Sequence, residues 1–115
     1  MPDNSLDLVR GTLDLVILKA LSWGPRHGVG VVRWIEEVTH QALQVEEGAL
    51  YPALHRLERK GWLEAEWGFT ERGRKARYYQ LTPGGRRQLT AELRTWTRYT
   101  QAIGRVIAAA GGTAR

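Results

Sequence analysis

A dense group of cations lies in the second half of the chain. Residues 72–87 carry six arginine and lysine side chains and no acidic residue: Arg72, Arg74, Lys75, Arg77, Arg86 and Arg87. Long, flexible cations on a protruding segment suit contact with the phosphate groups of a nucleic acid. A solvated charged loop is the alternative. We predict phosphate contacts from the four that lie on or beside a predicted hairpin turn, Arg72, Arg74, Lys75 and Arg77.

A second candidate site lies on a predicted helix at residues 47–60. Leu50, Leu54 and Leu57 recur at i, i+4 and i+7, which predicts a buried stripe. Small and polar groups near the start of the opposite face, followed by cations, suit entry into the major groove of DNA. An ordinary solvated helix face is the alternative. The predicted reading face comprises Ala49, Tyr51, Pro52, His55, Arg56 and Arg59.

Catalytic chemistry has no comparable support in the sequence. Glu36 and His40 could share a metal ion at i and i+4, but no third ligand has suitable spacing. Cysteine is absent, which excludes a thiolate zinc site and a cysteine nucleophile. The segment 28–30 lacks the further glycine and the preceding strand of a phosphate-binding loop. We therefore expect no catalytic residue, no metal site and no cofactor.

The last predicted helix carries an apolar seam with heptad spacing. Its members are Leu89, Leu93, Trp96, Ile103 and Ile107, with the polar Thr100 in one slot. No later element covers this helix, so we predict a homodimer through the seam, with Leu13 and Ile17 of the first helix contributing. Packing onto the first helix of the same chain is the alternative, and the two arrangements can coexist.

Two aromatic side chains on the same helix suggest a ligand site. Trp96 and Tyr99 could hold a planar hydrophobic or cationic molecule at a dimer seam. Aromatic residues at helical spacing are more often plain core, which is the alternative. We expect the five tryptophans of the chain mostly to fill the core.

The chain that must position these residues is short. It has 115 residues, a formal net charge of +5 and no cysteine, which favours one domain, a polyanionic partner and a reducing cytoplasm. The most apolar run, 13–21, contains Asp14 and Lys19 and is shorter than the roughly 20 residues of a membrane span, so we expect no membrane partner.

The order of predicted elements favours a mainly α (α+β) fold, the winged helix-turn-helix with a C-terminal dimerisation helix. Pro52 suits the third helix only within its first turn. His27 is expected to cap or pack at the start of the second helix, and Thr82 and Pro83 to begin the last one.

The expected helices are 12–23, 28–40 and 47–60, then strands around 63–67 and 78–81, and a helix from 83 onward. The expected domains are 1–83 for DNA binding, 84–108 for dimerisation and 109–115 as a flexible tail.

The segments 47–63 and 77–85 resemble the PadR family of bacterial transcriptional regulators, as do the shorter segments 11–14 and 24–28. The resemblance implies a homodimeric repressor on a palindromic operator, with the third helix as reader, the hairpin as wing and the last helix as dimer element. The length is similar to that of a short subfamily, some members of which bind hydrophobic drugs at the dimer interface. Two residues depart from the family pattern: Val29 replaces a common aromatic residue, and Ala49 replaces a common serine.

We therefore expect a cytoplasmic regulator that binds double-stranded DNA. One alternative is an effector-sensing member whose small hydrophobic ligand lies at the dimer interface. The other is a protein-interaction adaptor that does not bind DNA. Salt separates DNA binding from the adaptor, because binding to phosphates weakens steeply with ionic strength whereas an apolar protein contact does not.

Overall fold

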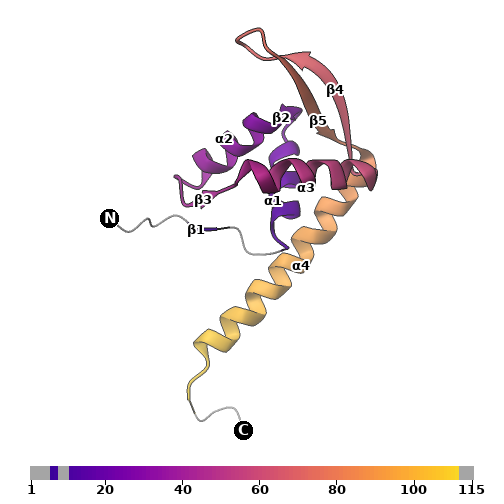
Figure 1. Cartoon of the computed structure of the whole chain (residues 1–115). Helices are drawn as coiled ribbons and strands as arrows, with labels where there is room; N and C mark the ends of the chain where they lie inside the picture. The colour runs from indigo at the N-terminus through magenta and orange to yellow at the C-terminus, as the bar shows by residue number, and fades with distance from the viewer. Residues whose placement is uncertain (1–5, 8–10, 112–115) are drawn as a thin grey trace, which may run out of the picture.

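Three helices enclose an apolar core, and a long fourth helix extends away from it (Figure 1). The computed structural model describes residues 6–7 and 11–111. A hairpin of two seven-residue strands projects on the other side of the core. In chain order, the main elements are α1 (Leu13–Leu21), α2 (Gly28–Val38), α3 (Glu47–Arg59), β4 (Leu63–Phe69), β5 (Lys75–Leu81) and α4 (Pro83–Ala108).

Short strands complete two sheets. β2 (Arg26–His27) pairs antiparallel with β5, so the larger sheet has the order β2-β5-β4. β1 (Leu6–Asp7) pairs parallel with β3 (Leu43–Gln44). Three helices followed by an antiparallel hairpin form the winged helix-turn-helix, so the predicted fold class is confirmed. The sequence did not predict β2, because a two-residue strand has no detectable alternation.

The core forms where the three small helices meet the sheet. Ile17, Leu18 and Leu21 of α1 and the α3 stripe of Leu50, Leu54 and Leu57 are buried, as are Tyr79 and Leu81 of β5. Removing a leucine of this kind down to alanine costs about 2–5 kcal/mol. The stripe therefore anchors α3 firmly, and it leaves the opposite face of that helix exposed.

Local caps set several helix starts as predicted. Nδ1 of His27 accepts a hydrogen bond from the N–H of Gly30 (3.2 Å) at the start of α2. Oγ1 of Thr82 accepts one from the N–H of Gly85 (3.0 Å), and Pro83 follows as the first residue of α4. Gly61 adopts a positive φ of 79° after α3, which is the usual backbone conformation just beyond a helix end.

Two helix ends and the setting of Pro52 differ from the predictions. α1 ends at Leu21 and α2 at Val38, each two residues before the approximate end predicted. Pro52 is the sixth residue of α3, beyond the first turn, so the carbonyl of Gly48 lacks its usual helical N–H donor. Both residues are exposed, and water can therefore hydrate that carbonyl.

α4 has a buried beginning and an exposed remainder. Leu89 lies in the core, whereas the helix from Leu93 onward is exposed to solvent. Of the predicted tail 109–115, residues 109–111 follow the helix, and 112–115 lie outside the described residues. No helix in the described ranges is long and apolar enough to span a membrane.

Candidate nucleic-acid interface

The outward face of α3 is exposed along its whole length. Ala49, Pro52, His55 and Arg59 are exposed, and Tyr51 is partly so. A Cβ atom on the buried Gly28 would lie 2.7 Å from the hydroxyl oxygen of Tyr51. Gly28 therefore leaves room for the Tyr51 ring against the start of α2. The tyrosine is held at one edge of the reading face.

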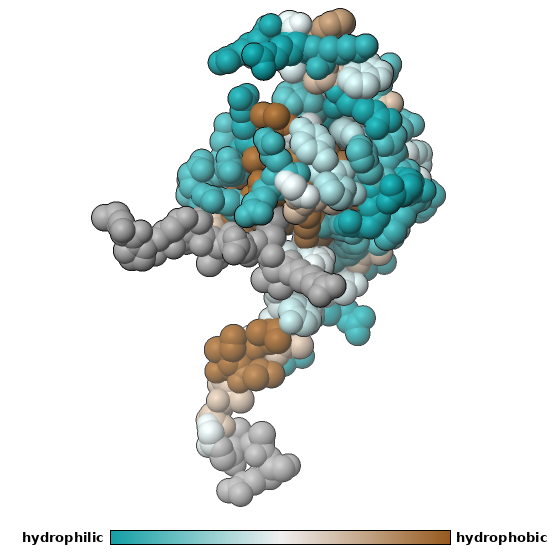
Figure 2. Space-filling view, viewed as in Figure 1, coloured by the Kyte–Doolittle hydropathy of each residue, from teal (hydrophilic) through white to brown (hydrophobic). Residues whose placement is uncertain are grey.

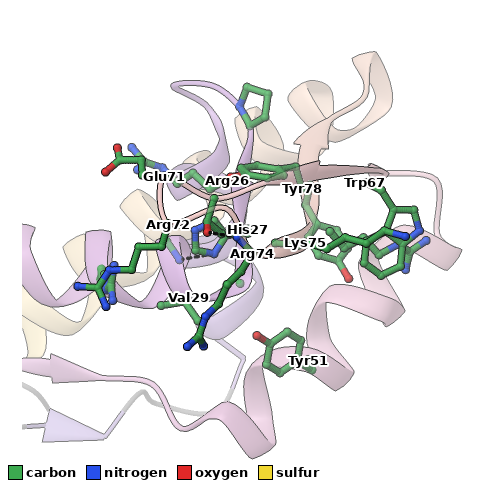
Figure 3. A pocket seen from close by; sticks show the side chains of 18 residues that line it. Arg26, His27, Val29, Tyr51, Trp67, Glu71, Arg72, Arg74, Lys75 and Tyr78 are labelled. Atoms are coloured by element: carbon green, nitrogen blue, oxygen red, sulfur yellow. Dashed lines mark hydrogen bonds between the residues drawn. The ribbon is translucent and has the colours of Figure 1, made fainter.

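A basic groove separates the hairpin from α2 and Tyr51 (Figure 3). Its volume is about 770 Å³. Arg72 and Arg74 extend from the hairpin on the side of α2 where Val29 lies, and Trp67 and Lys75 lie together further along. Among the described residues that line the groove, Glu71 is the single acidic one. The cations that line it are Arg26, Arg33, Arg72, Arg74, Lys75 and Arg77.

The turn of the hairpin is built from local bonds. The N–H of Thr70 donates to the carbonyl of Arg74 (2.8 Å), and Gly73 supplies a positive φ of 77°. Arg72, Arg74 and Lys75 are exposed on and beside this turn. In the described part of the chain, none of the three forms an ion pair with a carboxylate. Their charge is available to an external anion.

Arg77 differs from the other three hairpin cations. Its guanidinium donates to both carboxylate oxygens of Glu58 on α3, at 2.8 and 3.1 Å. It also lies 5.7 Å from the centre of the Tyr79 ring. A paired, bidentate geometry of this kind restrains both side chains. The Arg77 guanidinium, which we predict to contact a phosphate, is therefore bound to the Glu58 carboxylate in this structure.

Arg56 is also paired within the chain. Its guanidinium forms an ion pair with Asp14 in the first turn of α1. Arg56 and Glu58 lie about 160° apart around the α3 axis, at about 100° per residue. The two ion pairs therefore hold opposite flanks of α3, one to α1 and one to β5. The exposed reading face lies between them.

The apolar seam of α4 is exposed beyond its first member. Leu93, Trp96, Ile103 and Ile107 are all exposed, and the far part of the helix forms a hydrophobic patch (Figure 2). The rings of Trp96 and Tyr99 lie 6.4 Å apart on this helix. Leu13 of α1, which is also predicted to contribute to the dimer seam, is half-buried.

Ile17 cannot contribute to a dimer interface as predicted. Its side chain is 0% exposed because it packs in the core of its own domain. The first helix is apolar on nearly every side, and the sequence alone could not show which side the chain itself covers. The same burial removes Ile17 from the walls of any ligand site at the seam.

Several groove residues were not found from the sequence. Arg26 lies in the short strand β2, where its Nε donates to the carbonyl of Ala20 (3.0 Å). Arg33 comes from the exposed face of α2. Trp67 lines the groove, and both it and Trp23 are largely exposed, so they do not fill the core as expected. Within the described ranges, no three acidic or histidine side chains cluster in a way that could hold a metal ion.

Three helices followed by an antiparallel hairpin place the chain in the winged helix class of proteins. The PadR-like family of transcriptional regulators matches residues 17–91, so the chain belongs to that family and is a transcriptional regulator. It is 37% identical over 86 residues to transcriptional regulator Rv3488 of Mycobacterium tuberculosis, covering 74% of this chain and 76% of the relative.

Solved structures show the same architecture. A transcriptional regulator from Clostridium thermocellum superimposes with a TM-score of 0.76 at 27% identity, covering 84% of this chain and 93% of that one. A PadR family transcriptional regulator from Eggerthella lenta has a TM-score of 0.73 at 28% identity, covering 88% and 86% respectively. All three of these proteins are regulators of transcription.

Proposed function

We propose that this protein is a homodimeric repressor that binds a palindromic DNA operator in the cytoplasm. The observation that carries the proposal is a basic edge of the groove, made by the unpaired side chains of Arg72, Arg74 and Lys75. It lies beside an exposed face of α3. A cationic edge of this kind attracts phosphates. The adjacent helix face carries small and polar side chains followed by a cation, which suit contact with a major groove. Membership of a family of DNA-binding regulators supports the same function.

The predicted DNA-binding residues divide into three groups. Ala49, Tyr51, Pro52, His55 and Arg59 lie on or at the edge of the exposed α3 face and would meet base edges or the nearby backbone. Arg72, Arg74 and Lys75 would contact phosphates. Arg56 and Arg77 are already paired with Asp14 and Glu58, so we assign them to holding α3 and the wing in place.

The exposed seam on α4 supports the proposed dimer. Leu93, Trp96, Ile103 and Ile107 present apolar surface on a helix that extends away from the core. A matching helix from a second copy would cover it, with the half-buried Leu13 nearby. Two α3 helices in such a dimer would enter successive major grooves about 34 Å apart.

The wing cations provide the test. Selection of bound duplexes from a random library supplies a probe, and fluorescence anisotropy then measures affinity across salt concentrations. Replacing Arg74 and Lys75 with alanine removes up to four phosphate contacts per dimer. The slope of log K against log salt should flatten by up to about 3.6, at about 0.9 per phosphate.

A charge-matched variant separates a local contact from a general effect of charge. Arg86 and Arg87 are exposed at the start of α4 and do not line the groove. Replacing both with alanine removes the same charge and should change the slope less. Equal slopes in the two double variants would rule out the wing as a phosphate contact. Failure of the wild type to bind any duplex would favour the protein-interaction adaptor.

A hydrophobic effector is the second candidate, and the exposed Trp96–Tyr99 pair favours it. In the proposed dimer, the indole of Trp96 from each copy would stack on a planar, hydrophobic or cationic molecule at the seam. Tryptophan fluorescence titrated with a planar cationic dye should show saturable quenching that Trp96→Ala removes. The same quenching in Trp96→Ala would discard the site.

A further inference from the structure

Two aromatic side chains on the wing have no role in the proposed function so far. Trp67 and Phe69 are 62% and 71% exposed, although each is large and apolar. They lie two residues apart on β4, so they share one face of the hairpin. Exposed aromatic surface of this size is costly in water, and it is usually retained for contact with a partner.

The pairing register shows which face they occupy. Nearer the base, the same face carries Ala65 opposite Tyr79, which belong to the core. Further out, Trp67 lies opposite Arg77, and Phe69 opposite Lys75. Arg77 reaches Glu58 on α3 from this face. Trp67 and Phe69 therefore project on the side of the wing that faces α3.

Lys75 stacks its ammonium group on the Trp67 ring. Its ammonium nitrogen lies 4.9 Å from the centre of the indole. A cation stacked on an indole stabilises the ring position and remains available to an anion from its other side. The aromatic face and a phosphate-binding charge are thus presented together.

The charge around the rings identifies the partner. Arg72, Arg74 and Lys75 surround the tip, with Glu71 as the acidic side chain beside them. A polyanion with apolar surface satisfies both the cations and the rings. The minor groove of duplex DNA has these properties, because phosphates line its rims and deoxyribose forms its walls.

We propose that Trp67 and Phe69 form an apolar contact with the minor groove next to the major groove that α3 would occupy. The inference rests on the proposed DNA-binding function and adds a second mode of recognition to it. Aromatic wedges bind most easily where base steps open or the groove changes width. The wing would therefore add sequence preference at base pairs that α3 does not touch.

Removing the rings tests the contact. The duplex selected above is the probe, and anisotropy measures the affinity of Trp67→Ala, Phe69→Ala and the double variant. The double variant should lose about tenfold or more in affinity, the range of an aromatic–base contact. The slope of log K against log salt should stay at the wild-type value, because no cation is removed. Trp67→Phe keeps a ring and should retain most of the affinity.

Trp23 supplies a matched control. It is 70% exposed, and the ammonium of Lys19 lies 5.1 Å from the centre of its ring, yet it does not line the groove. Trp23→Ala should bind the probe as the wild type does. Equal losses in Trp23→Ala and Trp67→Ala would overturn the proposal, as would a flattened salt slope in the aromatic double variant.

A modified probe identifies the groove. Inosine replaces guanosine at the base pairs that the wing would contact. This change removes the amino group from the minor groove and keeps the hydrogen-bond acceptors of the major groove. The wild type should bind this probe more tightly, and the aromatic double variant should lose that gain. If the double variant bound the probe with wild-type affinity and still bound the inosine probe more tightly, the aromatic contact would be overturned. The proposed DNA-binding function would stand. Absence of any duplex binding by the wild type would instead overturn the proposed function, and this contact with it.

Discussion

Gly85 lies in the first turn of α4, where the helix passes close to the chain leaving α3. A Cβ atom at this position would lie 2.0 Å from the carbonyl oxygen of Trp62. That carbonyl accepts a hydrogen bond from the N–H of Thr82 (3.1 Å), which limits its freedom to move. The missing side chain of Gly85 therefore allows α4 to join the core at Leu89.

We expect Gly85→Ala to destabilise the protein by about 3 kcal/mol, the upper part of the range for overpacking, because a backbone carbonyl must be displaced. Gly84→Ala is the matched control, since a Cβ there makes contacts no closer than 3.6 Å. Alanine at position 84 should be neutral or stabilising by up to about 1 kcal/mol. Urea unfolding of both variants measures the difference, and equal midpoints would contradict the close approach.

At the scale of elements, α3 is restrained by more than its leucine stripe. Arg56 on one flank pairs with Asp14 of α1, and Glu58 on the other pairs with Arg77 of β5. All four side chains are partly exposed, so each pair contributes only about 1 kcal/mol or less to stability. Their main effect is on orientation, because they connect the reading helix to its neighbours.

Arg77 and Arg74 should therefore behave differently in DNA binding. Glutamine at position 74 removes an unpaired cation, so the salt slope should flatten by about 0.9 for each phosphate that the variant no longer binds. Glutamine at position 77 removes a cation that Glu58 already neutralises, so affinity should fall while the slope stays unchanged. Anisotropy across salt concentrations measures both. Equal flattening in the two variants would show that Arg77 leaves Glu58 to bind a phosphate.

The apolar core lies at one end of the molecule, and the exposed part of α4 lies at the other. From Leu93 onward α4 is exposed, and a hydrophobic patch covers the far part of the helix (Figure 2). The described part of the chain does not fold back to cover this patch. A second copy with the same patch would bury it by pairing helix against helix.

We expect the wild type to sediment at micromolar concentration as a dimer of the 13.0 kDa chain. Ile103→Asp places a charge in the seam and should give a monomer, whose core remains folded because Ile103 lies outside it. Gln101→Asp adds the same charge away from the seam and should remain dimeric. Sedimentation of the wild type as a monomer would contradict the dimer, and far-UV circular dichroism checks that each variant is folded.

Local chemistry determined much of this protein directly from the sequence. The stripe of Leu50, Leu54 and Leu57 follows the period of one helix, and the Thr82–Pro83 start needs only neighbouring residues. The strand pattern and the basic turn are local as well, so the winged fold and the hairpin cations could be predicted. In each case the controlling interaction spans a few residues.

Only the tertiary structure decided which of the candidate residues remain available. Arg56 meets Asp14 across 42 residues and Arg77 meets Glu58 across 19, so no local pattern could reveal that these cations are paired. Ile17 and Trp67 are both apolar, yet one is enclosed by the core and the other projects into the groove. Burial and charge pairing depend on what the rest of the chain brings alongside a residue, and residue type and spacing do not contain that information.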